Sequence, residues 1–131
     1  MLVSHPNEEL LRRGYEAFAK GDLPTVMSIF DEDIVWHSPG RSPLSGDFKG
    51  HQQVTEFFAK IFELSGGTFK NEIHDILADD EHAVVLVHVT AERAGKPFDA
   101  LGCHVWHLSN GKATEFWNLT LDPYAADEFW S

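Results

Sequence analysis

Two hydrophobic patterns divide the chain, one with helical spacing up to about residue 66 and one that alternates from residue 68 onward. In the first part, apolar residues recur three or four positions apart, as at Leu11, Tyr15 and Phe18. In the second part, apolar and polar residues alternate, which is typical of strands with one buried face. The sequence therefore predicts helices first and a sheet afterwards.

The helical part carries start and stop signals. Asn7 can cap a first helix that ends at Gly21, and Asp22 can cap a short second helix. A brief strand is expected at residues 34–37. The long helix predicted over residues 51–64 has a wide apolar face, which indicates that this helix packs against the core.

A loop over residues 38–50, which holds two prolines and three glycines, separates the brief strand from the long helix. The alternating segments then predict strands at about 68–78, 82–93, 98–108 and 113–121. Asn110-Gly111 is the clearest turn, because a type I′ turn needs two residues that tolerate positive φ. Short turns join antiparallel strands, so these four strands should form a meander. Asp122 can cap a short terminal helix.

This order of elements predicts one α+β domain over residues 1–131, with helices on one face of a curved, mostly antiparallel sheet. The chain length fits a single hydrophobic core. A long helix that crosses a curved sheet leaves a cone, and a cone of this size often holds a small apolar ligand.

Composition narrows the choice of partners. The formal net charge of −11 argues against binding to nucleic acid and to anionic membranes. No apolar run approaches the ~20 residues that a membrane-spanning helix needs. Cys103 is the single cysteine, and residues 1–5 lack the features of a signal peptide. We therefore expect a cytoplasmic protein without a disulfide.

Several local motifs, together with the order of elements, resemble the NTF2-like superfamily, in particular its SnoaL-like and ketosteroid-isomerase-like branch. The segments that carry this resemblance are Ala17–Asp22, Phe30–His37, Pro39-Gly40, Pro43–Gly46, Gly50, Ser109–Lys112 and Asp122–Trp130. It implies a cystatin-like cone, in which the sheet wraps around the long helix and two further helices lie at the N-terminus. It also implies a homodimer through the outer face of the sheet.

The resemblance places histidines where ketosteroid isomerases have carboxylates. Their aspartate base falls at His37 or its neighbour Ser38, and a second, protonated aspartate falls at His104. Their tyrosine falls beside Tyr15. Imidazole titrates near neutrality, so His37 could remove a proton next to a carbonyl group. His104, Asn118 or Tyr15 could then stabilise the oxyanion.

Alternation and the resemblance together define the expected pocket. The expected ligand contacts are Tyr15, Phe58, Phe62, Trp106, Phe116 and Asn118. We expect no cofactor, and no metal site, because no two histidines have the spacing of a ligand pair.

Two functions stay open at this point. One is an acid–base isomerase, cyclase or dehydratase, of ketosteroid-isomerase-like or polyketide-cyclase-like type, that acts on an apolar carbonyl compound. The other is a binding protein for a hydrophobic metabolite, in which the buried histidines only satisfy hydrogen bonds.

Overall fold

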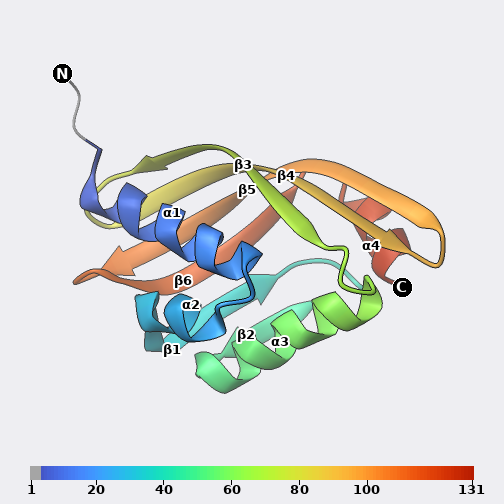
Figure 1. The fold of residues 1–131 in the computed structure, drawn as a ribbon, viewed down its shortest axis with the longest axis horizontal. Coiled ribbons are helices and arrows are strands. Elements are labelled where there is room, and N and C mark those ends of the chain that lie inside the picture. The colour runs from blue at the N-terminus through green and yellow to red at the C-terminus, as the bar shows by residue number, and fades with distance from the viewer. Residues whose placement is uncertain (1–3) are drawn as a thin grey trace.

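The computed structural model describes residues 4–131, which form helices and a curved sheet (Figure 1). The elements are α1 (Pro6–Ala19), α2 (Leu23–Ile29), β1 (Phe30–Ser38), β2 (Gly46–Lys49), α3 (Gly50–Leu64), β3 (Lys70–Ala78), β4 (His82–Arg93), β5 (Lys96–Ser109), β6 (Lys112–Thr120) and α4 (Pro123–Trp130). This arrangement confirms the predicted α+β class. Within residues 4–131, no helix is long and apolar enough to cross a bilayer.

The strands of the described chain form one sheet in the order β2-β1-β6-β5-β4-β3. Strands β3 to β6 are the predicted antiparallel meander, while β1 runs parallel to β6 and places Trp36 beside Phe116. Strand β2 pairs with β1 and lies inside the segment that was predicted to be a loop. That prediction was wrong because a strand of four residues is too short for alternation to reveal it.

The core lies between the inner face of the sheet and the helices. On β4, Val85 and Val87 share one face of the strand and are almost completely buried. On α3, Val54 and Phe58 are buried as well, and the ring of Phe58 contacts that of Trp36 on β1 with centroids 5.2 Å apart. Helix α4 packs at the end of the sheet where β4 turns into β5 (Figure 1), where Phe129 stacks on Phe98 with ring centroids 4.7 Å apart. The helices and the curved sheet thus enclose the space in which the site lies.

Asp22 is confirmed as the cap of α2, since its Oδ1 accepts a hydrogen bond from the backbone N–H of Thr25 at 3.2 Å. Asp122 caps α4 in the same way. The prediction that Asn7 caps α1 is wrong. The cap is His5, because Pro6 lacks an N–H group and suits the first helical position.

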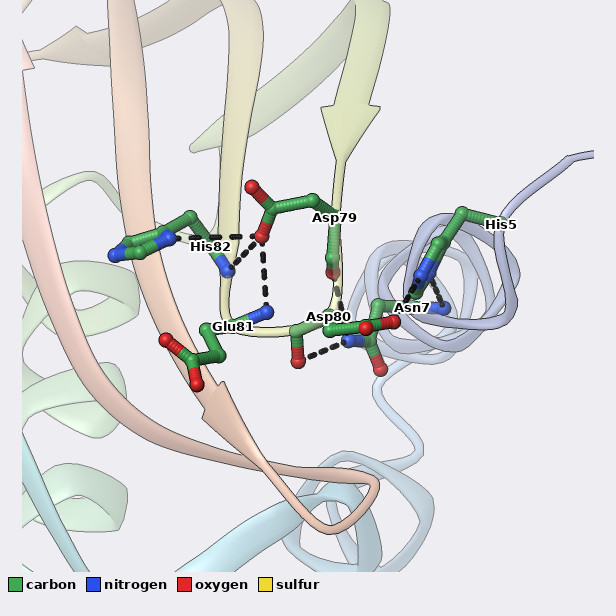
Figure 2. Close-up of polar contacts among 6 residues, drawn as sticks. All are labelled: His5, Asn7, Asp79, Asp80, Glu81 and His82. Carbon is green, nitrogen blue, oxygen red and sulfur yellow. Dashed lines mark hydrogen bonds and ion pairs between the residues drawn. The ribbon is translucent and has the colours of Figure 1, made fainter.

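Asn7 instead attaches the start of α1 to the turn between β3 and β4 (Figure 2). Its Nδ2 atom donates to the carbonyl oxygens of Asp79 and Asp80 at 3.0 and 3.1 Å. Asp79 in turn accepts hydrogen bonds from the backbone N–H groups of Glu81 and His82, which keeps this turn in shape. These contacts fix the position of α1 on the sheet, and α1 carries Tyr15.

Candidate functional site

A cavity of about 140 Å³ lies between the inner face of the sheet and the helices. Five of the residues expected to contact a ligand line it, and they are Tyr15, Phe58, Trp106, Phe116 and Asn118. Phe62, the sixth expected contact, is not part of this lining. Its ring stacks on Phe18 with centroids 5.4 Å apart, so Phe62 fills the space between α1 and α3.

His104 is a buried titratable residue of the cavity lining, with 7% of its surface exposed. It shares the inner face of β5 with Trp106, two residues further along the strand. The hydroxyl oxygen of Tyr15 lies 2.6 Å from His104 Nδ1, and Trp106 Nε1 donates to the same oxygen at 3.2 Å. The helix α1 and the strand β5 are therefore joined by a chain of buried hydrogen bonds.

The direction of the hydrogen bond between Tyr15 and His104 is coupled to which nitrogen of His104 carries the proton. Trp106 can only donate, so the Tyr15 oxygen accepts from it, and the Tyr15 O–H then needs an acceptor of its own. His104 Nδ1 is the acceptor within reach. When Tyr15 donates to Nδ1 in this way, the proton of the neutral ring sits on Nε2. Within residues 4–131 nothing forms a hydrogen bond with Nε2, so this N–H is available to a ligand in the cavity.

Burial keeps both groups of this pair neutral. It lowers the pKa of His104 to about 3, because the protonated ring would lose its hydration without gaining an anionic partner. Burial also raises the pKa of Tyr15 well above its ordinary value, although the hydrogen bond from Trp106 acts in the opposite direction. At neutral pH the pair can donate a hydrogen bond to a ligand, but it is a poor proton acceptor.

His37 lies on the outer face of the sheet, and the structure does not bring it to His104. Because Trp36 points inward, alternation turns its neighbour His37 outward. The Nδ1 and Nε2 atoms of His37 lie 2.7 Å from Asp47 Oδ1 and 2.6 Å from Glu115 Oε2. The scheme in which His37 serves as the base beside His104 does not fit this placement.

The cavity also has polar lining residues that the sequence did not single out. Three of their side-chain atoms are buried without a hydrogen-bond partner, namely Trp36 Nε1, Asn71 Oδ1 and Thr120 Oγ1. Buried polar atoms are usually paired, and an unpaired one costs about 1–3 kcal/mol. Alternation along β3 and β6 already indicates that Asn71 and Thr120 point inward. Their lack of hydrogen-bond partners depends on packing, which the sequence does not reveal.

Asp127 of α4 is the one carboxylate among the described lining residues. Its Oδ1 accepts a hydrogen bond from the backbone N–H of Arg41 at 2.9 Å. Gly40 has a positive φ of 109°, and a Cβ atom added there would lie 2.3 Å from that same oxygen. Glycine at this position therefore lets the loop after β1 approach α4 beside the cavity.

Residues 4–131 contain no group of three histidine, cysteine or acidic side chains arranged to hold a metal ion.

Comparison with known proteins identifies the family. The sequence profile of the SnoaL-like domain matches residues 11–116. The chain belongs to the SnoaL-like family. An uncharacterised protein of Mycobacterium tuberculosis (strain ATCC 25618 / H37Rv) is 30% identical to this SnoaL-like protein over 124 residues, which cover 94% of this chain and 95% of that protein.

Solved structures agree with this assignment. Bal32a, from a soil-derived mobile gene cassette, is 40% identical with a TM-score of 0.92, and the match covers 96% of this chain and 97% of Bal32a. A protein of unknown function with a cystatin-like fold, from Xanthomonas campestris, is 25% identical with a TM-score of 0.89 over 95% of this chain and 98% of that one. The NTF2-like, cystatin-like fold inferred from the sequence is thereby confirmed.

Proposed function

We propose that this SnoaL-like protein binds an apolar carbonyl compound in its cavity, with the carbonyl oxygen accepting a hydrogen bond from His104 Nε2–H. One observation carries the proposal. A buried, neutral imidazole has its remaining N–H group available on the wall of a largely apolar cavity. This imidazole is held in place from behind by Tyr15, so its donor is oriented before a ligand arrives.

The charges of the lining favour a neutral ligand. No lysine or arginine is among the described lining residues, so a buried carboxylate or phosphate would have no cation to compensate its lost hydration. A carbonyl oxygen needs only one or two donors. The volume of about 140 Å³ is close to that of cavities that accept one aromatic ring.

Acetophenone and α-methylstyrene provide a matched pair of probes, because they differ only in that a CH₂ group replaces the carbonyl oxygen. In calorimetric titrations, we expect wild-type protein to bind acetophenone about fivefold more tightly, which corresponds to roughly 1 kcal/mol for one hydrogen bond. His104→Phe should abolish this preference. His88→Gln, a change on the outer face, should preserve it.

The ratio of the two affinities corrects for any general change in the shape of the cavity. Equal affinities in the wild-type protein would contradict the role of His104. Failure of both probes to bind would contradict the assignment of the cavity as a ligand site for compounds of this size.

Acid–base isomerisation is the second candidate, and Asp127 is the observation that favours it. A carboxylate could remove a proton next to the bound carbonyl, while His104 Nε2–H stabilises the resulting enolate oxygen. The test is conversion of cyclohex-3-enone to its conjugated isomer, followed by ultraviolet absorbance. Asp127→Asn keeps an acceptor for the N–H of Arg41, so it should remove this activity without loss of acetophenone binding. Absence of activity in wild-type protein would leave binding as the function.

A further inference from the structure

His37 is held between two carboxylates that belong to different strands. Asp47 lies on β2 and Glu115 on β6, while His37 is near the end of β1, which runs between them. The ring of His37 also stacks on Trp117 with centroids 5.1 Å apart. These contacts link the edge strand β2 to the centre of the sheet through one imidazole.

With both carboxylates ionised, only a doubly protonated ring satisfies the two contacts of His37 together. The distances from Nδ1 to Asp47 Oδ1 and from Nε2 to Glu115 Oε2 are 2.7 and 2.6 Å, and an ionised carboxylate can only accept a hydrogen bond. A neutral imidazole has one N–H group, so it can serve only one of the two. The other carboxylate would then face a nitrogen lone pair, and that contact would become repulsive.

The surroundings of His37 favour the protonated form. Burial opposes it, but the hydrogen bonds to Glu115 and Asp47 outweigh burial and raise the pKa of His37 above its ordinary value. His107 on β5 also contacts the cluster, and its Nδ1 lies 3.4 Å from Glu115 Oε1. Lys49 follows Asp47 on the same face of β2.

The cluster lies at the root of the loop that borders the cavity. That loop leaves β1 after Ser38 and enters β2 at Gly46, and Pro39, Gly40 and Leu44 of the loop line the cavity. In the described chain β2 pairs with β1 alone, and it also contacts α3, where Phe48 packs on Phe57 with ring centroids 4.9 Å apart and the backbone N–H of Lys49 donates to Gln53 Oε1 at 2.8 Å. The contacts of His37 with Asp47 and Glu115 tie β2 to β6, so their loss would act on the loop that lines the cavity.

We propose that His37, Asp47 and Glu115 form a pH-sensitive clamp that holds β2 and the loop before it closed over the cavity while His37 is protonated. The direction of the pH dependence follows because the folded protein binds the protonated ring more tightly than the neutral ring. The clamp is complete at pH values below the ordinary pKa of histidine, and it weakens as the pH rises through the raised pKa of His37. The part of this proposal that concerns ligand access rests on the proposed function.

Hydrogen–deuterium exchange of residues 39–49 tests the clamp directly. After correction for intrinsic exchange rates, we expect wild-type exchange to rise about three- to fivefold between about pH 5.5 and about pH 8.5, as befits a partly exposed ion pair. His37→Gln should exchange at the faster rate at both pH values. His88→Gln is the matched control, since His88 also contacts two carboxylates, Asp99 and Glu72, but lies away from this loop, and it should behave as wild type.

A pH-independent rate in wild-type protein would overturn the clamp, and so would an equal pH dependence in His37→Gln. Should His37→Gln fail to fold, Glu115→Gln leaves the imidazole in place and removes one charged acceptor. Its exchange should depend less on pH than that of wild type, and an unchanged pH dependence would again overturn the clamp.

The dissociation rate of acetophenone, measured by NMR line shape at the two pH values, tests the effect on ligand access. It should rise by a similar factor in wild-type protein and not in His37→Gln. The dissociation rate of acetophenone could change equally with pH in wild type and in His37→Gln while loop exchange depends on His37. That result would refute the effect on ligand access but not the clamp. If acetophenone does not bind at all and loop exchange still follows His37, the proposed function fails and the clamp stands.

Discussion

Tyr15→Phe removes a single oxygen atom from the centre of the buried hydrogen-bond chain. The phenylalanine ring would keep the packing of Tyr15, whose ring lies 5.8 Å from that of His104 and 6.2 Å from that of Trp106, measured between centroids. The change would leave two buried groups without a partner, His104 Nδ1 and Trp106 Nε1–H. The variant therefore isolates the polar contribution of Tyr15.

The expected loss can be worked out from these two groups. A buried polar atom left without a partner costs about 1–3 kcal/mol. His104 Nδ1 can recover part of this if the ring takes up its other tautomer or if water enters the cavity. We therefore expect the free energy of unfolding to fall by about 2–4 kcal/mol, which is a large share of the roughly 5–15 kcal/mol that stabilises a typical domain.

Urea unfolding, monitored by circular dichroism, measures this loss. Tyr124→Phe is the matched control, because Tyr124 is 86% exposed and the same chemical change there should cost less than about 0.5 kcal/mol. A loss below about 0.5 kcal/mol in Tyr15→Phe would refute the view that this oxygen joins α1 to β5.

Three further predictions concern other parts of the molecule. Because burial lowers the pKa of His104 to about 3, the unfolded chain takes up a proton at this residue below about pH 6.5 while the folded protein does not. The free energy of unfolding should therefore fall by up to about 1.4 kcal/mol per pH unit as the pH drops through that range. In urea titrations at several pH values, His104→Gln should make this dependence of stability on pH weaker. An unchanged dependence would show that His104 does not resist protonation. Asn7→Ala removes two hydrogen bonds to the β3–β4 turn and should lower stability by about 1–2 kcal/mol, measured by thermal unfolding; no change would mean that this contact does not hold α1. Leu101 and Leu119 are 58% and 48% exposed on the outer face of the sheet, where we predict a homodimer interface. Sedimentation equilibrium should give twice the chain mass for wild type and a single chain mass for Leu101→Asp. A monomeric wild type at micromolar concentration would contradict this interface.

The meander was predictable from sequence because alternation and turn chemistry are local signals. Asn110 takes the positive φ expected of the turn, at 51°, and the strands on either side of it end within a few residues of their predicted limits. The parallel pairing of β1 with β6 was not predictable. It joins residues that lie 80 or more positions apart, and no local pattern specifies which distant strand lies alongside.

Part of the candidate site was likewise predictable from the sequence, and part was not. The inward direction of His104 is confirmed by its burial, and it was predicted from the family resemblance, because both faces of that strand are partly apolar and alternation alone does not decide between them. His37 was expected in the pocket because the resemblance places the base of ketosteroid isomerases there, but the inward residue at that end of β1 is Trp36. The hydrogen bond between Tyr15 and His104 crosses 89 positions of sequence, so only the packing of α1 on the sheet could reveal it.

The state of the His104 ring is the most direct test of the proposed binding mode. In ¹⁵N NMR spectra of the imidazole side chains, the proposal predicts a neutral ring with its proton on Nε2 down to about pH 5. It further predicts that the Nε2–H resonance moves when acetophenone is added and stays in place when α-methylstyrene is added. A protonated ring at that pH, a proton on Nδ1, or an equal response to both probes would contradict the proposal.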